Sequence, residues 1–564
     1  MHTVICCLNS KYIHSSLAPW CLLAGVRAYS QYAGTVQVVE GTVNEPMSAV
    51  LERITENAPQ VIGFCTYIWN VTEVLALSKA LKQQNHAVRI VLGGPEVSYR
   101  AKDVLENYPF IDFVLSGEGE KPFAQLLDAL TKQSDLSAVG GLCYRTGDTF
   151  HISEPYLPTE EPVSPYVAEY LQTLRGRIAY LETSRGCPYS CAFCLSGRCG
   201  TVRFFDLERA KENLLLLANS GAQTVKLVDR TFNADKRRAY ALFSFIIENY
   251  GGKIPNGVCF HFEIAGDILD DCLIEVLRTA PAGSIQLEIG LQSFNETTLA
   301  AVNRKTDTNR LIENIKKLIA PRNIHIHIDL IAGLPHEDAE SFADSFNRAF
   351  ALQPDMLQFG FLKLLYGAPM RENPTEYPCV FSETPPYEVQ STPWLTAEEL
   401  AQMHRAEDAF DRTYNSGRFR RTADFALQAC GISPFAFFSR FADWLSETNR
   451  QTQRTPLDMY SEYLFLFLTE HLHLDAAAVR DKMVCDRLAT NASGVLPRFL
   501  QQQDARLKGI RTALQVNPNT KTQKGVKRAV AILYTENRAV YADYNVPNPV
   551  TGAYILHFIP FNEN

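Results

Sequence analysis

Three cysteines in one short stretch have a spacing suited to metal chemistry. Residues 181–194 read LETSRGCPYSCAFC, so Cys187, Cys191 and Cys194 follow the pattern C-x3-C-x2-C directly after a β-type run that ends in Arg-Gly. A tight loop with this spacing aims three thiolates at one iron–sulfur cluster, whereas a structural [4Fe–4S] site uses four. One iron of such a cluster is left open to a substrate-like molecule.

A structural zinc knuckle is the alternative for these cysteines. Zinc sites commonly show two cysteine pairs or Cys/His pairs, and no matching second pair follows, since Cys199 lies nearby at a different spacing. The pattern therefore favours the cluster. It resembles the radical S-adenosylmethionine superfamily, in which the residue before the last cysteine, here Phe193, is typically aromatic.

Composition indicates a large globular chain. Its 564 residues predict roughly three or four domains. A net charge of −8 argues against a globally basic nucleic-acid binder. No apolar run is long enough to span a bilayer, and the first residues predict a strand rather than a signal peptide. We therefore expect a cytoplasmic protein without membrane association, whose fourteen cysteines stay reduced.

Strands alternate with helices over residues 1–140, which predicts a Rossmann-like, doubly wound parallel sheet. Ligands bind such sheets at the carboxyl ends of the strands, where we expect the loops 9–16, 66–70, 93–96 and 116–120. Two of these loops are glycine-rich, reading GGPE and SGEGE. Glycine lets the backbone approach a flat or anionic ligand, although a plain turn would be the default for either loop alone.

The two glycine loops and the opening LNSKYIHSSLAP resemble the cobalamin-binding domain of cobalamin-dependent radical S-adenosylmethionine enzymes. The resemblance implies a corrin at this sheet edge, with the nucleotide tail buried in the sheet. It implies cobalamin contacts by Tyr12, His14, Ser15, Ser16, Thr66, Tyr67, Trp69, Gly93, Gly94, Pro95, Glu96, Gly117, Glu118, Gly119 and Glu120.

The cobalt environment departs from one version of that domain. Domains that supply a histidine to cobalt carry D-x-H-x-x-G after the first strand, and this chain keeps only His14 of that pattern. We expect His14 to contact cofactor or substrate, or to pack, rather than to bind cobalt. By resemblance Tyr67, Ile68 or Trp69 covers the lower cobalt face, and an ordinary core tryptophan is the alternative for Trp69.

Residues 141–176 are rich in proline between 155 and 165, which predicts an extended linker. Over 177–385 six strands are each followed by a helix, too few for a closed eight-fold barrel. The predicted strands are 179–183, 224–228, 258–263, 284–290, 325–331 and 357–362. They fit the partial (β/α)6 barrel of the superfamily, with chemistry at the strand carboxyl ends.

Polar residues near those strand ends are the candidates for binding S-adenosylmethionine. By resemblance, strand residues contact its methionine and ribose, and backbone near Phe193 and strand five holds its adenine. Carboxylates suit an ammonium and an arginine suits a carboxylate, while a solvated rim charge is the alternative for each. The expected contacts are Phe193, Asp229, Glu263, Gln292, Ser293 and Arg304, with Glu288 a further candidate. Arg230 stands where family members carry a second acidic residue, which predicts an altered substrate contact.

The C-terminal region, 386–564, predicts a small helical domain followed by three short strands. It resembles an uncharacterised C-terminal domain found on a subfamily of these enzymes. Residues 506–528 carry seven basic side chains and no acidic one. Such a run could meet RNA, but a solvated linker is the preferred interpretation.

The resemblance implies a cobalamin-dependent radical S-adenosylmethionine enzyme that methylates an unactivated carbon. Its cofactors would be a [4Fe–4S] cluster held by the three cysteines, S-adenosylmethionine and cobalamin. An external electron donor such as flavodoxin or ferredoxin is expected, with a small molecule or peptide as substrate. No general base is evident, and radical hydrogen transfer needs none. The alternatives are a non-methylating rearrangement or cyclisation, an RNA-modifying enzyme, and a cobalamin sensor without catalytic activity.

Overall fold

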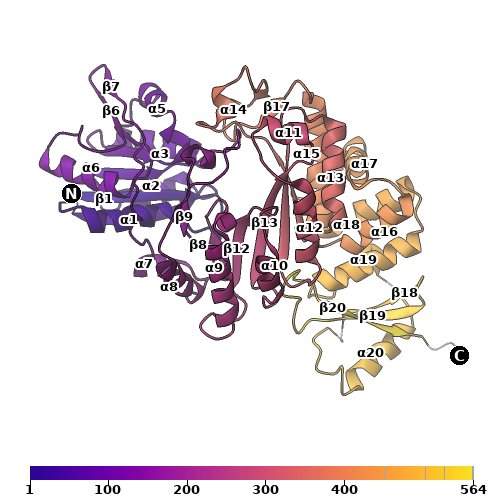
Figure 1. Cartoon of the computed structure of the whole chain (residues 1–564). Helices are drawn as coiled ribbons and strands as arrows, with labels where there is room; N and C mark the ends of the chain where they lie inside the picture. The colour runs from indigo at the N-terminus through magenta and orange to yellow at the C-terminus, as the bar shows by residue number, and fades with distance from the viewer. Residues whose placement is uncertain (33, 451, 502, 526–527, 562–564) are drawn as a thin grey trace. The chain divides into compact units, whose positions relative to one another are not determined.

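The computed structural model describes residues 1–564 except 33, 451, 502, 526–527 and 562–564, and it describes Cys199 without its side chain (Figure 1). The chain forms two compact units. The first comprises residues 1–290, 297–314 and 361–393, and the second comprises 291–296, 315–360 and 394–564. Strand β13 therefore begins in the first unit and ends in the second.

The N-terminal part of the first unit is a seven-stranded sheet in the order β2-β1-β3-β4-β5-β6-β7. The first five strands pair in parallel, which confirms the predicted Rossmann-like architecture. These strands are β1 (His2–Asn9), β2 (Thr35–Thr42), β3 (Val61–Cys65), β4 (Arg89–Gly93) and β5 (Phe113–Leu115). The helices between them are α1 (Ala18–Tyr29), α2 (Met47–Thr55), α3 (Val71–Gln84), α4 (Pro95–Ser98), α5 (Ala101–Asn107) and α6 (Glu120–Lys132).

The two faces of this sheet are filled differently. Side chains alternate along a strand, and one set, which includes Cys6, Phe64 and Leu92, packs with residues of α2, α3 and α5 into a continuous apolar core. The opposite set includes small residues such as Gly63 and Gly93. Small side chains on that face leave room for a cavity.

The predicted linker 141–176 begins differently from the expectation. β6 (Leu142–Thr146) and β7 (Thr149–His151) extend the N-terminal sheet as antiparallel strands. They are joined by a tight turn at Gly147, whose φ is +57°, and a Gly-Asp pair between short strands is a hairpin signal. The prolines that predicted a linker lie beyond this hairpin, and α7 (Ala168–Thr173) follows them.

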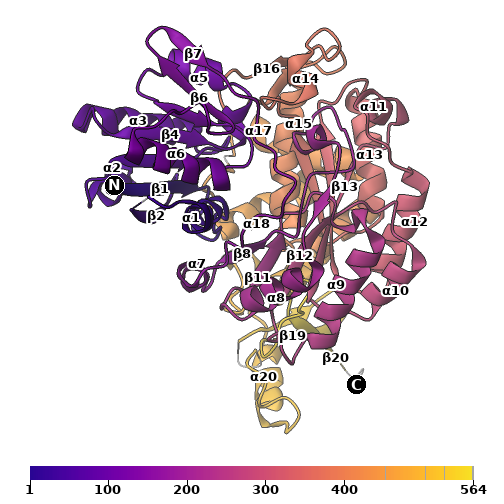
Figure 2. The ribbon, with the colours of Figure 1, turned by 60° about the vertical axis from the view of Figure 1, so that its left-hand side comes forward.

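The strands that follow in the first unit form a parallel sheet ordered β8-β11-β12-β13. They are β8 (Ile178–Leu181), β11 (Thr224–Leu227), β12 (Cys259–Ile264) and β13 (Ile285–Gln292), and Figure 2 shows β8, β11 and β12 side by side. The helices after them are α8 (Leu207–Ala218), which follows the cluster loop, α9 (Lys236–Asn249), α10 (Asp271–Arg278), α11 (Glu296–Ala301) and α12 (Thr308–Ile319). Along β13 buried apolar residues alternate with half-buried ones such as Glu288, so one face of the sheet is polar.

In the second unit the strand order continues β13-β14-β15, with β14 (His325–Ala332), β15 (Met356–Phe361) and the intervening α13 (Ala339–Ala351). This agrees with the expected α/β class and six-stranded partial barrel. Five helices then form the predicted helical region. They are α15 (Ala397–Phe410), α16 (Arg420–Cys430), α17 (Pro434–Glu447), α18 (Leu457–Leu466) and α19 (Ala476–Thr490).

The basic run 506–528 is not the simple linker that was preferred. α20 (Arg506–Val516) occupies its first half and packs on the antiparallel strands β18 (Val530–Leu533), β19 (Arg538–Asp543) and β20 (Ile555–Pro560). Leu507 and Leu514 share a small apolar core with Val530 and Tyr541, because apolar residues seven apart fall on one helix face. Of the seven basic residues, Lys527 lies outside the described residues. Among the described residues, no helix has the length and apolarity needed to cross a membrane.

Candidate active site

The three cysteines lie in a loop with a closed neck. β9 (Ser184–Arg185) and β10 (Arg203–Phe204) pair antiparallel, with Arg185 opposite Arg203. Gly186, at the start of the loop, has φ +98°, and a Cβ there would meet the carbonyl oxygen of Thr201 at 2.1 Å. Only glycine fits this close approach, so the residue before Cys187 is dictated by backbone geometry.

Backbone hydrogen bonds hold the loop between Cys191 and Cys194. The amide of Ala192 donates to the carbonyl of Val302 at 2.9 Å, and its carbonyl accepts from the amide of Met370 at 3.0 Å. The amide of Cys194 donates to the carbonyl of Cys191 at 3.1 Å. The loop conformation is thus held by segments far apart in the sequence.

The cysteine environment fits a metal cluster. Cys187 and Cys191 are buried, and Cys194 and Phe193 are half-buried. The guanidinium of Arg304 lies 3.8 Å from the Cys191 sulfur. Burial raises the pKa of Cys191, and Arg304 opposes that rise. A nearby cation favours thiolate, which is the form that binds iron.

Two of the residues predicted to bind S-adenosylmethionine are already fully engaged by protein. Asp229 accepts hydrogen bonds from the Thr183 amide at 3.0 Å, the Thr183 hydroxyl at 2.8 Å and the Ser184 hydroxyl. Burial raises its pKa to about 6. Ser293 is buried and donates to Glu337 at 2.5 Å. Both side chains hold loops that follow barrel strands, so a direct role in binding stays a prediction.

The other predicted residues, Arg304, Gln292 and Glu263, differ in their surroundings. Arg304 contacts the cluster loop, as described above. Gln292 has φ +72°, and its amide oxygen has no hydrogen-bond partner among the described residues. Glu263 lies 3.7 Å from Lys226 and 4.0 Å from Arg230.

Glu288 belongs to a polar group on the sheet face. It accepts from Lys226 at 2.9 Å and lies 2.8 Å from the His261 ring nitrogen. These partners lower its pKa to about 2 against the effect of burial. A carboxylate engaged by two side chains is better explained as structural than as a free ligand.

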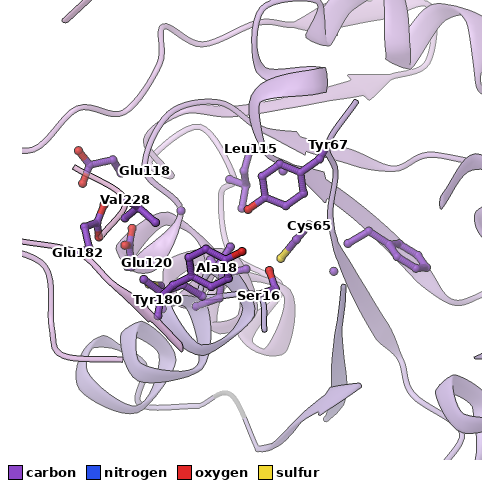
Figure 3. A pocket seen from close by; sticks show the side chains of 18 of the residues that line it. Ser16, Ala18, Cys65, Tyr67, Leu115, Glu118, Glu120, Tyr180, Glu182 and Val228 are labelled. Carbon is purple, nitrogen blue, oxygen red and sulfur yellow. The ribbon is translucent and has the colours of Figure 1, made fainter. Parts of the chain in front are cut away.

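A cavity of about 600 Å³ opens at the carboxyl ends of the N-terminal strands. Figure 3 shows Cys65, Tyr67 and Leu115 on one side of it and Glu118, Glu120 and Glu182 on another. The cavity is also lined by Val228 and Arg230, at the end of β11. Residues from the N-terminal sheet and from the barrel strands of the same unit therefore face a single space.

Most of the predicted cobalamin contacts line this cavity. They are His14, Ser15, Ser16, Tyr67, Trp69, Gly93, Gly94, Gly117, Glu118, Gly119 and Glu120. Four are not among the lining residues: Tyr12 is strongly exposed, Thr66 is buried, and Pro95 and Glu96 lie in α4. Glu96 instead binds Arg100 and the hydroxyl of Tyr387.

The cavity wall fits a large ligand with an inserted tail. A Cβ at Gly93 would meet only Leu115, at 3.8 Å, so a larger side chain there would enter the cavity. Gly63, Cys65 and Val91 of the sheet and Ala18 and Cys21 of α1 also line the cavity. The small residues on this face of the sheet therefore leave the room that the cavity occupies.

His14 has a partner that the sequence did not indicate. Its Nδ1 lies 2.8 Å from the hydroxyl of Tyr180 on β8, and both residues line the cavity. Burial and nearby cations, Lys11 and Lys226 among them, lower the pKa of His14. Tyr67 and Trp69 stack with ring centroids 4.4 Å apart, and the Trp69 indole donates to the carbonyl of Leu8.

Glu118 and Glu120 were predicted cavity residues, but the sequence did not indicate their partner Arg185. This side chain binds Glu118, Glu120 and Glu182, and Arg203 binds Glu118. Thr231 was also not predicted from the sequence, although its hydroxyl lies 3.4 Å from the Cys187 sulfur. Glu118 and Glu120 lie in the motif SGEGE, and Thr231 lies in the run LVDRTFN. The contacts of these residues with Arg185 and Cys187 join segments that are distant in the sequence, so they are seen only in the structure.

Family models match three consecutive parts of the chain. Residues 4–127 match the B12 binding domain, 181–349 match the radical SAM superfamily, and 375–538 match a protein of unknown function, DUF4080. The chain thus combines a B12 binding domain with a radical SAM domain. Its cofactors are accordingly a [4Fe–4S] cluster, S-adenosylmethionine and cobalamin.

Individual relatives are similar over about half of this chain. The 2-(S-pantetheinyl)-carbapenam-3-carboxylate methyltransferase of Streptantibioticus cattleyicolor is 31% identical over 315 residues, 51% of this chain and 44% of the relative. The cobalamin-dependent radical SAM methyltransferase TokK of Streptomyces tokunonensis is 29% identical over 318 residues, 53% of this chain and 46% of the relative. The chain thus spans less than half the length of these relatives.

A solved structure shares the fold over more of the chain. The cobalamin-dependent S-adenosylmethionine radical enzyme OxsB, with aqua-cobalamin and S-adenosylmethionine bound, superposes with a TM-score of 0.58 at 13% identity. The match covers 86% of this chain and 78% of OxsB. It supports the fold of the N-terminal domain, partial barrel and helical region.

Proposed function

We propose that this protein is a methyltransferase that adds a methyl group to an unactivated carbon of a small molecule or peptide. The observation that carries the proposal is the single cavity lined both by the glycine loops and by residues at the barrel strand ends. When bound, the cluster with S-adenosylmethionine supplies a carbon radical, and cobalamin supplies the methyl group. The two methyltransferase relatives support this outcome.

The residues of the chain position and enclose these groups. Cys187, Cys191 and Cys194 would hold the cluster, and Arg304 would favour their charged form. The glycine loops, together with Tyr67 and Trp69, line the cavity and would hold the cobalamin. The electron for each turnover would come from an external donor such as flavodoxin or ferredoxin.

Arg230 suggests the character of the substrate. The other charged residues that line the cavity form close pairs around Arg185, whereas the ion pair of Arg230 with Glu263 is 4.0 Å long and the Arg230 side chain is 56% exposed. A guanidinium presents several donors to a carboxylate or phosphate. We infer a substrate with an anionic group near this residue.

The test is anaerobic reconstitution of the full-length protein with iron, sulfide and hydroxocobalamin, followed by S-adenosylmethionine and cell extracts. We expect both 5′-deoxyadenosine and S-adenosylhomocysteine by mass spectrometry. Replacing Cys187, Cys191 and Cys194 together with alanine should abolish 5′-deoxyadenosine, whereas C272A, at an exposed cysteine of α10, should not. Persistent absence of S-adenosylhomocysteine, with 5′-deoxyadenosine present, would favour rearrangement or cyclisation instead.

The cavity assignment has its own test. Gly93→Leu should abolish hydroxocobalamin binding without unfolding the protein, because its side chain would extend into the cavity. Gly509→Leu is the matched control, since no atom lies within 4 Å of a Cβ placed there. Equal cobalamin binding by both variants would place the cofactor elsewhere.

A further inference from the structure

One guanidinium in the first unit binds three carboxylates. Arg185 donates from Nη2 to Glu120 at 2.6 Å and from Nε to Glu182 at 2.8 Å, and from Nη1 it binds Glu118. Its side chain is only 19% exposed. Arg203 adds a second cation, 2.7 Å from Glu118. The group therefore contains three acidic and two basic side chains.

The members of this group come from the two regions expected to hold cofactors. Glu118 and Glu120 flank Gly119 in the loop after β5, and all three residues line the cavity. Arg185 and Arg203 lie opposite each other in the ladder that closes the neck of the cluster loop. The group thus joins the cavity loop to the cluster loop through side-chain contacts.

The distance along the chain from this group to the cluster is short. Only Gly186 separates Arg185 from Cys187, and that glycine is held against Thr201 by the close backbone approach described above. A movement of the cavity loop that carried Glu118 and Glu120 would therefore be transmitted to Arg185 and the neck. Arg185 makes a two-pronged bond to Glu182 and one charge-assisted hydrogen bond each to Glu118 and Glu120, and such bonds are strong.

An exposed pair in the same unit provides a contrast. Arg27 binds Glu169 at 2.7 Å, joining α1 to α7, but its side chain is 49% exposed and that of Glu169 is 51% exposed. Exposed pairs contribute little, whereas removing one partner of a poorly solvated pair leaves an uncompensated charge. The Arg27–Glu169 pair and the Arg185 group each join separate segments, but of the two only the Arg185 group connects the cavity loop to the cluster loop.

We propose that Arg185 is a positioning residue that couples the two cofactor sites, so that loading the cluster changes the affinity of the cavity for cobalamin. The proposal rests on the proposed function only in requiring that both cofactors bind. By linkage, cobalamin must change the affinity of the cluster site by the same factor. An arginine is needed because a lysine lacks the planar fork that holds three carboxylates at once.

The experiment compares cobalamin affinity with and without the cluster. Full-length protein is prepared anaerobically in cluster-free and reconstituted forms, and hydroxocobalamin binding is measured by equilibrium dialysis. For the wild type we expect the two dissociation constants to differ by about fivefold or more, the lower end of ordinary coupling. R185K and the isosteric E120Q should bring the ratio close to one, while R27M should retain the wild-type ratio.

The ratio of the two dissociation constants would not change if Arg185 had only a structural role. Unfolding midpoints of the variants check that they fold. Equal dissociation constants for the two wild-type forms would overturn the proposal, as would an unchanged ratio in both R185K and E120Q. Failure of both forms to bind hydroxocobalamin would overturn both this inference and the cobalamin site. Retained coupling without any methylated product would overturn the proposed methylation alone.

Discussion

Two buried carboxylates, Asp229 in the first unit and Glu337 in the second, hold loops in similar ways but are hydrogen-bonded to different extents. Both oxygens of Asp229 accept hydrogen bonds, from Thr183 and Ser184. Glu337 accepts from Ser293 at 2.5 Å and Ser345 at 3.4 Å through one oxygen. Among the described residues its other oxygen has no partner.

The pKa values of the two carboxyl groups are raised to a similar extent. Burial raises the pKa of Asp229 to about 6 and that of Glu337 to about 7, and hydrogen bonds oppose the rise in both. Asp229 holds Thr183 and Ser184, just before the cluster loop, by hydrogen bonds to both of its oxygens. Glu337 holds Ser293 through one oxygen, and its negative charge is less well compensated by hydrogen bonds. Removing the first group should therefore be costly, and neutralising the second should be favourable.

The largest effect is expected for Asp229→Ala. The Thr183 amide and two hydroxyls would lose their acceptor, and each unsatisfied buried donor costs about 1 to 3 kcal/mol. We expect a loss of about 4 kcal/mol in the free energy of unfolding of the first unit, measured by denaturant titration, together with poor cluster reconstitution measured as bound iron. A variant with wild-type stability and iron content would contradict the role given to Asp229.

Glu337→Gln should stabilise the protein at alkaline pH. The folded-state pKa of about 7 lies above the ordinary 4.5, so the stability that this group contributes is complete below pH 4.5 and is lost as the pH rises through 7. The loss corresponds to about 3 kcal/mol at pH 8. The glutamine variant avoids it, because its amide can still accept from Ser293.

The measurement is the unfolding midpoint of wild type and E337Q at pH 5 and pH 8. The stability advantage of the variant should be near its full value at pH 8 and shrink to about 1 kcal/mol at pH 5. An advantage that does not depend on pH would show that Glu337 is not the titrating group.

Asp229→Asn is expected to stabilise the protein at pH 8 by less than E337Q does, because lost hydrogen bonding worth about 2 kcal/mol offsets the relief of a carboxylate whose pKa is raised to about 6. An asparagine offers one acceptor oxygen and an NH2 group, which would face either the Thr183 amide or the hydroxyls. Unfolding midpoints of D229N and E337Q at pH 8, measured side by side, test this difference. Equal shifts for the two variants would remove the distinction between the carboxylates.

The smallest change is expected for Thr183→Val. It removes one hydroxyl that donates to Asp229 at 2.8 Å and leaves the backbone hydrogen bond in place. The expected cost is about 1 kcal/mol, accompanied by a further rise in the pKa of Asp229. Unfolding midpoints from pH 5 to pH 8 would reveal that rise as a steeper loss of stability with increasing pH.

The parts of the site that could be predicted from sequence are local. Three cysteines within eight residues, and two glycine loops after predicted strands, identify themselves by spacing. The partners of these motifs could not be predicted in the same way. Arg185 is 67 residues from Glu118, and Ser293 is 44 residues from Glu337. Such pairs depend on how strands are brought together, which local patterns do not encode.

Fold class was predictable for the same reason, because alternating apolar strands and amphipathic helices reveal a parallel sheet. The hairpin β6–β7 was missed because the nearby prolines outweighed a single Gly-Asp turn. Helix α20 was missed because seven basic residues drew attention from the three apolar ones, Leu507, Ile510 and Leu514, that fall on one helix face.

The two hydrogen bonds at Ala192 have a consequence for how the protein matures. Their partners, Val302 and Met370, are translated 110 and 178 residues after Ala192, and synthesis proceeds at about 5 to 20 residues per second. The thiols are therefore made several seconds before the backbone between them is held in place. Iron–sulfur insertion into the organised loop must wait until Met370 has left the ribosome, so a nascent chain that stops short of it would not yet offer the finished site.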